Sequence, residues 1–495
     1  MKTWLVALGL LVASLAPAQK AKTVDNVDPK KAVKFTIVQL NDVYEIAPVG
    51  GEGGMAKVAT VLNKYKAADP NSFLVLAGDF FSPSALGTAR VNGERLAGQQ
   101  MVAVLNQIPL SLATFGNHEF DLNEALFHKR LAESKFEWVS GNCFDAAGNP
   151  FENVAPYRIR TITGPKGSVK IGFFGVTIPS TPAKYVSYTD FMAAAEKAIR
   201  ELRPQVDVLI AVTHLAFEDD IRLAQRFPEV DMIIGGHEHE HHRIEIASLA
   251  GIYKADANAR TLYIHQFAFD PSQRQLAKKS FVERLSKDVR EDPRVKTEVD
   301  KWVKIAFDAF RKDGFEPTKV VANVPISLDG SEASVRKKPT ELTKIIASGM
   351  LAAVPGTDLA IYNGGSVRID DVLAPGILTE YDVIRILPFG GKIVSVEMKG
   401  SLLQTVLDQG VKNAGTGGYL QTANVERSDS GWTVNGAAID PGKAYRVAIS
   451  DFLLTGAETG LPYLKRDHPD LKVIAEHADI RTATIEELKR RYPMR

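Results

Sequence analysis

Short apolar runs alternate with amphipathic stretches from residue 35 to about residue 285. The runs are rich in β-branched residues, which predicts strands at 35–40, 73–77, 169–176, 206–212, 232–234 and 262–267. After the first run, Met55, Val58, Leu62 and Tyr65 recur at the spacing of one helix face, which predicts a helix over 55–68. Strands that alternate with helices are typical of a layered α/β domain.

A long amphipathic helix is predicted over 292–312. Its apolar positions recur at helical spacing on a strongly charged background, and they are Val295, Val299, Trp302, Val303, Phe307 and Phe310. After a break at 314–317, a helix over 340–353 and a strand over 358–362 indicate a second α/β domain. We therefore expect an N-terminal domain at 34–290, a connector helix at 291–316 and a C-terminal domain at 317–495.

The first residues have the pattern of a secretory signal peptide. A basic Lys2 precedes an apolar stretch at 4–15, and the small residues Ala16 and Ala18 follow it. We expect a signal peptide at 1–18 and an exported protein, periplasmic or secreted. The single cysteine, Cys143, agrees with export because an exposed free thiol is a liability in an oxidising compartment.

Composition excludes several classes of protein. The 495 residues include 60 Lys and Arg against 59 Asp and Glu, so the formal net charge is +1 and no nucleic-acid partner is expected. One cysteine excludes a disulfide framework and a Cys-based zinc site. No stretch after the N-terminus reaches the ~20 apolar residues of a spanning helix, so no membrane span is expected. The pattern leaves the oligomeric state open.

Five polar clusters each follow an apolar run that predicts a strand. They are Asn-Asp-Val-Tyr-Glu at 41–45, Gly-Asp at 78–79, Gly-Asn-His-Glu-Phe-Asp at 116–121, Thr-His at 213–214 and Gly-Gly-His-Glu-His at 235–239. Open α/β sheets place ligands at the carboxyl ends of their strands. Carboxylates, an amide oxygen and imidazoles suit Zn, Mn or Fe(II) better than calcium. Because Asp79 has two oxygens, it could bridge two ions and so form a centre that holds a phosphoryl group.

The ordered set of clusters resembles the motifs of the calcineurin-like metallophosphoesterases. In the second half, the segments 363–368, 387–390 and 445–452 resemble motifs of the 5′-nucleotidase C-terminal domain. The chain is thus similar to the secreted or periplasmic 5′-nucleotidases of the UDP-sugar hydrolase type. The resemblance implies an α/β fold: a four-layer α/β/β/α metallophosphoesterase sandwich joined by a long helix to a second α/β nucleotide-binding domain. In this family the two domains rotate relative to each other, and we expect the same here.

The resemblance also implies a centre of two divalent metal ions, which could be Zn, Mn or Co. The first ion would be held by Asp42, Asp79 and His239. The second would be held by Asp79, Asn117, His214 and His237. Tyr44 stands where the family has His. Its phenol could bind a hard ion such as iron, hydrogen-bond a bound water, or leave the first site weak.

Catalytic and substrate-binding roles follow from the same resemblance. His118 would stabilise the phosphoryl group or protonate the leaving oxygen, oriented by Asp121, while a metal-bound hydroxide attacks phosphorus in line. In the second domain, Arg368 would bind phosphate and Asn363 the base or ribose. The other substrate contacts would be the stacking rings Phe389 and Phe452, and Glu458 at the place of a ribose-binding Asp.

The predicted function is release of phosphate from extracytoplasmic nucleotides, with UDP-sugar and nucleotide pyrophosphate hydrolysis as further candidate activities. Three alternatives stay open at this point. The same scaffold could serve a 2′,3′-cyclic nucleotide phosphodiesterase or a thiosulfohydrolase. A nucleotide-binding protein whose metal centre has decayed at Tyr44 is the third, although the presence of His118 and Asp121 argues against it.

Overall fold

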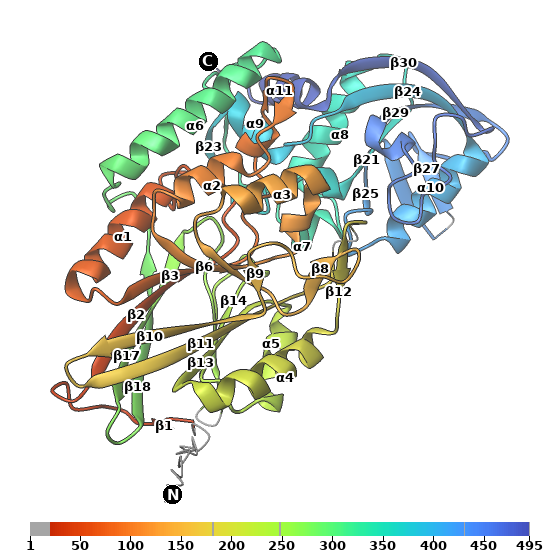
Figure 1. Cartoon of the computed structure of the whole chain (residues 1–495). Helices are drawn as coiled ribbons and strands as arrows, with labels where there is room; N and C mark the ends of the chain where they lie inside the picture. The colour runs from red at the N-terminus through yellow and green to blue at the C-terminus, as the bar shows by residue number, and fades with distance from the viewer. Residues whose placement is uncertain (1–19, 181–182, 247–248, 430, 495) are drawn as a thin grey trace, which may run out of the picture. The chain divides into compact units, whose positions relative to one another are not determined.

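The structure, a computed structural model, describes residues 20–180, 183–246, 249–429 and 431–494. The chain divides into two compact units (Figure 1). Unit 1 comprises the residues up to Ser82 together with Leu96–Val303, and unit 2 comprises Pro83–Arg95 together with Lys304–Arg495. The predicted signal peptide at 1–18 lies outside the described residues.

The first sheet of unit 1 has the strand order β1-β18-β17-β2-β3-β6-β7-β9. Its strands are β1 (Lys22–Thr23), β2 (Val33–Leu40), β3 (Ser72–Ala77), β6 (Leu110–Thr114), β7 (Glu137–Val139), β9 (Val154–Ala155), β17 (Thr261–Asp270) and β18 (Gln275–Arg284). The strands β2, β3, β6, β7 and β9 run parallel to one another, whereas β17 is antiparallel to both β2 and β18. The parallel strands therefore end at one edge of the sheet.

The second sheet has the strand order β10-β11-β13-β14-β16-β15. Its strands are β10 (Tyr157–Gly164), β11 (Gly167–Thr177), β13 (Val208–His214), β14 (Met232–Gly235), β15 (His242–Ile244) and β16 (Gly251–Lys254). The four central strands are parallel, and β10 and β15 are antiparallel edge strands. The strand predicted at 206–212 is β13, which begins and ends two residues later than predicted. The 3-10 turn η3 (Arg203–Gln205) precedes it, and His214 is its last residue.

The two sheets pack face to face. Phe35 and Ile37 of β2 and Val75 of β3 share one buried cluster with Ile171 of β11 and Ile210 of β13. Helices cover the outer faces: α1 (Met55–Ala68) packs on β3, α4 (Phe191–Leu202) on β11, and α5 (Phe217–Arg226) on β14 and β16. The predicted four-layer α/β/β/α sandwich is therefore confirmed, and the helix predicted over 55–68 has the predicted bounds.

Unit 2 is built on a five-stranded sheet with the order β25-β21-β29-β24-β30. Its strands are β21 (Leu359–Asn363), β24 (Lys392–Lys399), β25 (Leu420–Ala423), β29 (Ala444–Ser450) and β30 (Leu471–Asp479). Helix α8 (Glu341–Ala353) begins one residue after the predicted start, because Thr340 is its N-cap and accepts the N–H of Thr343. This sheet and its helices form the predicted second α/β domain.

Smaller elements complete the two units. The helices are α2 (Gln99–Leu105), α3 (Glu124–Glu133), α7 (Glu332–Val335), α9 (Glu380–Ile386), α10 (Gly400–Lys412) and α11 (Ile480–Arg491). Short paired strands are β4 (Arg90–Val91) with β5 (Glu94–Arg95), β8 (Cys143–Asp145) with β12 (Val186–Tyr188), β19 (Val320–Val324) with β23 (Gly376–Thr379), β20 (Leu328–Asp329) with β22 (Val372–Leu373), and β26 (Val425–Ser428), β27 (Gly431–Val434) and β28 (Ala437–Ala438). Cys143 is buried, and burial raises its pKa to about 12.

The predicted connector helix is α6 (Pro293–Lys312), and Asp292 caps it by accepting the N–H groups of Arg294 and Val295. The division between the units falls inside this helix, after Val303. The units also differ from the predicted domains at Pro83–Arg95. This segment lies within the predicted N-terminal domain, but it groups with unit 2. The domain boundaries drawn from the sequence stay a prediction.

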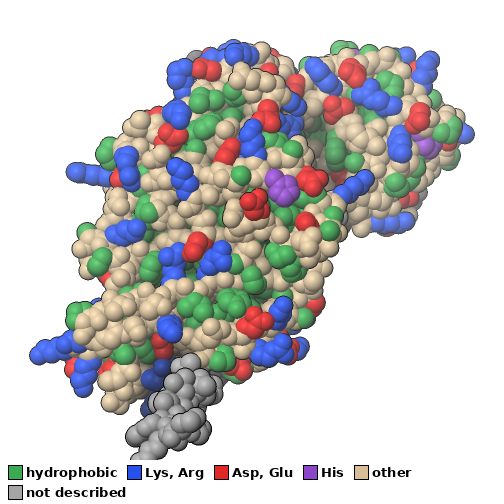
Figure 2. Space-filling view, viewed as in Figure 1, with side chains coloured by type: hydrophobic (Ala, Val, Ile, Leu, Met, Phe, Trp, Pro, Cys, Tyr) green, Lys and Arg blue, Asp and Glu red, His purple; other side chains and the backbone are tan. Residues whose placement is uncertain are grey.

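The surface agrees with the near-neutral composition. On the face shown in Figure 2, Lys and Arg side chains are interspersed with Asp and Glu side chains over each unit. Within the described ranges, no helix combines the length and the apolar character needed to cross a bilayer.

Candidate functional site

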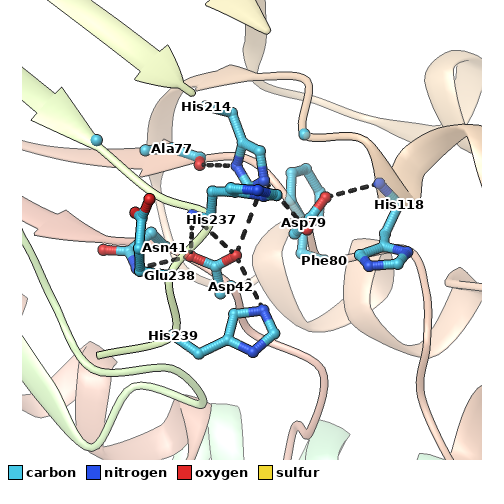
Figure 3. Close-up of polar contacts among 12 residues, drawn as sticks. Asn41, Asp42, Ala77, Asp79, Phe80, His118, His214, His237, Glu238 and His239 are labelled. Atoms are coloured by element: carbon cyan, nitrogen blue, oxygen red, sulfur yellow. Dashed lines mark hydrogen bonds and ion pairs between the residues drawn. The ribbon is translucent and has the colours of Figure 1, made fainter. Parts of the chain in front are cut away.

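The polar clusters predicted from the sequence lie at the carboxyl ends of neighbouring strands in unit 1. Asp42 follows β2, Asp79 follows β3 and Asn117 follows β6 in the first sheet. His214 ends β13 and His237 follows β14 in the second sheet. Because the two sheets pack face to face, both sets of strand ends reach one place (Figure 3).

Two carboxylates and one imidazole form the centre of the site. Ligand atoms of Asp42, Asp79 and His214 all lie within 4.8 Å of one another, and the three side chains are fully buried. The Nε2 atom of His214 lies 3.1 Å from Asp79 Oδ2 and 3.9 Å from Asp42 Oδ1. The Nδ1 atom of His214 donates to the carbonyl of Ala77 at 2.8 Å, so Nε2 is the atom left to bind a ligand.

Tyr44 and His239 close one side of this centre. The Nε2 atom of His239 lies 3.5 Å from Asp42 Oδ1. The Tyr44 hydroxyl lies 2.8 Å from His239 Nε2 and donates to Asp79 Oδ2 at 3.2 Å. The residue that departs from the family pattern therefore has its phenol among the predicted ligands.

His237 reaches the centre through its backbone as well as its ring. Its N–H donates to both carboxylate oxygens of Asp42, at 3.0 and 3.2 Å. Its ring stands edge-on to His214, with 5.3 Å between the ring centroids. The structure thus brings both histidines of the predicted second site beside the two carboxylates.

The loops that carry these ligands have unusual backbone conformations. Asp42, Asp79, His237 and His239 have φ angles of 53°, 57°, 95° and 63°, in the left-handed region that costs a non-glycine residue about 1–3 kcal/mol. Such conformations persist where the surroundings hold them, and they cluster at functional sites. At Gly236 a Cβ would lie 2.4 Å from the Ala77 carbonyl oxygen, so only glycine lets the two sheets approach this closely.

Glu119 organises the loops after β3 and β6, a role that sequence reasoning missed. Its Oε1 accepts the N–H groups of Phe80 and Phe81 at 2.7 and 3.1 Å. Its Oε2 accepts the N–H groups of Asp79 and Gly116 at 2.9 and 2.5 Å. Burial, and then the charge of Asp79, raise the pKa of Glu119 to about 7. Its place in the Gly-Asn-His-Glu motif was the signal that could have found it.

Asn41 and Asn258 hold the loop after β2, and neither was predicted as a site residue. The Asn41 amide donates to Asp42 Oδ2 at 2.7 Å and to the Ala255 carbonyl at 2.9 Å. The Asn258 side-chain oxygen accepts the N–H groups of Tyr44 and Glu45 at 3.0 and 3.1 Å. The segment that follows β16 therefore positions Asp42 and Tyr44.

His118 lies at the rim of the centre, in the 3-10 turn η2 (His118–Asp121). Its N–H donates to Asp79 Oδ1 at 2.8 Å, which ties this turn to the carboxylate (Figure 3). Its ring Nδ1 lies 2.8 Å from Asp121 Oδ2, and the Ser82 hydroxyl donates to the same oxygen at 3.1 Å. The ring of His118 therefore contacts Asp121, and the orienting role that the resemblance implies for Asp121 stays a prediction.

The charges at the centre are strongly coupled. Burial alone would lower the pKa of His214, but the carboxylates of Asp79 and Asp42 raise it to about 10. Burial alone would raise the pKa of Asp79, but His214 and His118 hold it well below its usual range. Burial, and then the charge of His214, lower the pKa of His237 to about 3. Positive charge beside the buried carboxylates thus stabilises them, and a bound cation could also supply that charge.

The residues present fit divalent metal ions. Asn117 Oδ1 is buried and has no hydrogen-bond partner among the described residues. This points to ligation, because buried polar atoms otherwise find a hydrogen bond. Carboxylate oxygens, an amide oxygen and imidazole nitrogens are ligands of Zn, Mn, Co and Fe. These donors could hold the predicted metal ions.

The predicted substrate residues lie in unit 2. Asn363 ends β21 and is buried, and its side-chain oxygen accepts the Ser366 hydroxyl at 2.6 Å. The Arg368 guanidinium lies over the ring of Phe389, with 5.8 Å to the ring centroid. Arg368 Nη1 also lies 3.6 Å from the carboxylate of Glu332, which was not predicted.

Two aromatic rings of unit 2 are exposed. Phe389 is 46% exposed and Phe452, in the 3-10 turn η5 (Asp451–Leu454), is 41% exposed. Both rings are accessible, as the stacking role implied by the resemblance requires. Glu458, in the loop after η5, is buried, and its Oε1 accepts the N–H of Thr459 at 2.8 Å. The structure therefore joins Arg368 with Phe389. The loop after Phe389 also reaches the residue before Phe452, because the N–H of Lys392 donates to Asp451 Oδ2 at 2.8 Å.

Two family models match the chain. The calcineurin-like phosphoesterase family matches residues 35–241, and the 5′-nucleotidase C-terminal domain matches residues 319–466. Each match covers one of the two regions described above, the metal-ligand cluster and the exposed rings.

Relatives and solved structures agree with these families. The trifunctional nucleotide phosphoesterase protein YfkN of Bacillus subtilis is 26% identical over 90% of this chain, which spans 33% of that protein's length. A 5′-nucleotidase of Homo sapiens is 27% identical over 80% of this chain and 75% of its own. The 5′-nucleotidase precursor of Thermus thermophilus shares the fold, with a TM-score of 0.73 at 23% identity over 93% of this chain and 97% of its own. The chain belongs to the calcineurin-like phosphoesterases that carry a 5′-nucleotidase C-terminal domain, and it is a metal-dependent phosphoric ester hydrolase.

Proposed function

We propose that this protein is a 5′-nucleotidase that releases phosphate from nucleotides at a centre of two divalent ions. The buried cluster of Asp42, Asp79 and His214, with Asn117 Oδ1 left without a hydrogen bond beside it, carries the proposal. UDP-sugars and nucleotide pyrophosphates are further candidate substrates of the same centre.

The predicted ligands divide into two sets that share Asp79. Asp42, His239 and Tyr44 would complete the first set, which their mutual contacts support. The second set is completed by Asn117, His214 and His237. Two bound ions would supply positive charge to the phosphoryl oxygens and a nucleophilic water at neutral pH. Iron becomes a candidate for the first set because the Tyr44 phenol lies within it.

His118 is the proposed acid. Its Nδ1 faces the Asp121 carboxylate at 2.8 Å, so Nδ1 carries a proton and the ring is held in one orientation. The opposite nitrogen, Nε2, would then donate a hydrogen bond to the phosphoryl group or a proton to the leaving oxygen. The carboxylate of Asp121 stabilises the charged imidazolium, as the acidic partner of a catalytic histidine does.

Unit 2 would bind the nucleoside and the outer phosphates. The Arg368 guanidinium is planar and can donate bidentate hydrogen bonds to phosphate oxygens. The exposed rings of Phe389 and Phe452 would stack on the nucleobase, because every base offers a flat apolar face. Asn363 and Glu458 would contact the base and the ribose hydroxyls.

We infer that the protein works outside the cytoplasm, in the periplasm or the medium. The signal-peptide pattern predicted at 1–18 supports this. The relatives include a snake venom 5′-nucleotidase of Naja atra. Cell fractionation after expression of the full chain would test the inference, and a product that stays in the cytoplasm would refute it.

The activity is tested by phosphate release from AMP, ADP, ATP, UDP-glucose and 2′,3′-cyclic AMP, with Mn²⁺, Zn²⁺ or Co²⁺ added and a coupled phosphatase for diesters. Sulfate release from a thiosulfonate is measured beside it. Release from AMP that is lost in His118→Ala and Asp79→Asn supports the proposal. His128→Ala, an exposed histidine of α3, is the matched control and should keep wild-type activity. Turnover of the cyclic nucleotide or the thiosulfonate alone would assign one of the alternative hydrolases. No turnover with any metal would refute the proposal.

A further inference from the structure

A buried lysine lies behind the metal-ligand loops. Lys254 is the last residue of β16 and is fully buried. Its Nζ lies 2.9 Å from Asp220 Oδ2, is paired with Glu238 Oε2, and donates to the Leu215 carbonyl at 2.7 Å. One ammonium thus joins α5, the residue after His214, and the loop after β14.

Glu238 is the link between this lysine and the predicted ligands. It lies between His237 and His239 in the chain, and its other oxygen accepts the N–H of Phe217, the first residue of α5, at 2.6 Å. In the view of Figure 3, Glu238 lies on the far side of Asp42 from His118. Its side chain therefore anchors the histidine loop to α5 and β16.

The loop needs such an anchor because of its backbone. His237 and His239 both have left-handed φ angles, of 95° and 63°, and Glu238 is the residue between them. Left-handed non-glycine residues persist only where the surrounding contacts hold them. At Gly235 a Cβ would lie 2.9 Å from Lys254 Cε and 3.0 Å from Asp220 Oδ2, so the end of β14 is packed directly onto the ion cluster.

The charges of the cluster argue for a role beyond stability. The side chains of Lys254 and Asp220 are 1% and 0% exposed, and that of Glu238 is 21% exposed. Burial alone would lower the pKa of Lys254, but Asp220 and Glu238 raise it above its ordinary value, so the ammonium stays charged. Buried ion pairs seldom stabilise a fold more than apolar residues of equal size would, and their best-attested use is to select one arrangement.

We infer that Lys254, through Glu238, is a positioning residue of the metal centre that holds His237 and His239 in the orientation needed to bind the ions. This inference rests on the proposed two-ion centre. Partners of metal ligands that are not themselves ligands commonly change metal affinity by ~10- to 100-fold when they are replaced.

Two variants of the full chain test the inference. Lys254→Met removes the ammonium, and Glu238→Ala removes the anchor while leaving Lys254 paired with Asp220. The second variant keeps the test decisive should the first fail to fold. Arg203→Met is the matched control, because it removes another largely buried ion pair. The Arg203 side chain is only 11% exposed, and its Nη1 lies 3.1 Å from Asp231 Oδ2. Asp231 directly precedes β14, at the end of the strand away from His237.

Each protein is stripped of metal with a chelator and titrated calorimetrically with Mn²⁺ and Zn²⁺. Urea unfolding of the metal-free proteins and the visible spectrum of bound Co²⁺ are recorded beside it. We expect Glu238→Ala and Lys254→Met to bind at least one ion about 10-fold to 100-fold more weakly, with an altered Co²⁺ spectrum. Arg203→Met should lower resistance to urea while its metal affinity and spectrum stay those of the wild type.

Two outcomes would overturn the inference, and they differ in what else they refute. Where the wild type binds two ions and Glu238→Ala binds them equally well, the cluster is merely structural and the inference fails alone. Where the wild type takes up no ion, the proposed function fails, and the inference fails with it.

Discussion

Glu119 accepts four backbone N–H groups from the loops that carry Asp79 and Asn117. Replacing it with Gln keeps its size but not its hydrogen bonds. The amide offers one oxygen, so two of the four N–H groups would face an NH₂ group that is itself a donor. Glu119→Gln therefore tests whether one carboxylate holds both loops.

The cost follows from the number of orphaned groups. Each buried N–H left without an acceptor costs about 1–3 kcal/mol, so two predict a loss of about 2–6 kcal/mol in the free energy of unfolding. Removing the charge offsets part of this, because burial and then the charge of Asp79 raise the pKa of Glu119 to about 7. We expect the lower part of the range, about 2–4 kcal/mol.

The assay is urea unfolding of the metal-free protein above pH 8, followed by tryptophan fluorescence, to which Trp138 contributes. This residue reports on the right region, because its ring stacks on Phe80 with 5.3 Å between centroids. Glu196→Gln is the control, since Glu196 pairs with Arg226 at the surface, where such pairs contribute about 1 kcal/mol or less. If Glu119→Gln and Glu196→Gln unfold at the same urea concentration, the four N–H groups do not depend on Glu119 and the reasoning is refuted.

Three other perturbations give separable results. Tyr44→Phe removes the hydroxyl between His239 and Asp79, and we expect about 10-fold weaker binding of one ion, measured by metal analysis after dialysis; unchanged affinity would exclude the phenol as a ligand. Arg368→Ala should raise KM for AMP about 10-fold or more and change kcat less, and a wild-type KM would remove Arg368 from the binding site. Burial lowers the pKa of His265 to about 3, so its contribution to stability is complete above pH 6.5 and is lost as the pH falls toward 3, by up to about 1.4 kcal/mol per pH unit. His265→Gln should flatten that acid-side slope in urea unfolding, and an unchanged slope would contradict the assignment.

Local patterns were sufficient for the elements and for the positions of the ligands. The helix periodicity from Met55 gave α1 with the bounds that the structure has, because apolar spacing and packing on the sheet agree there. The clusters at Asp42, Asp79 and His214 were found because each follows an apolar strand, and parallel strands end at one edge.

Contacts between distant segments were not accessible to the same reasoning. Asn258 supports the loop of Tyr44 from 214 positions along the chain, and nothing in its local sequence marks it. Lys254 looks like an ordinary polar end to a strand, and only the packing of β16 beside β14 shows that it is buried. The pairing of β1 with β18 was likewise missed, since a strand of two residues carries no periodic signal.

The grouping of Pro83–Arg95 with unit 2 determines how the protein can be dissected. The polypeptide passes between the units after Ser82, after Arg95 and again within α6. A chain that ends at Val303 would retain Pro83–Arg95 without the unit to which this segment belongs, and Leu86 and Ala89, which are buried in the whole chain, would lose part of their cover. Proteolysis within α6 alone would leave the fragments joined through that segment. Separate production of the catalytic half therefore requires replacement of Pro83–Arg95 by a short polar turn in addition to a new C-terminus.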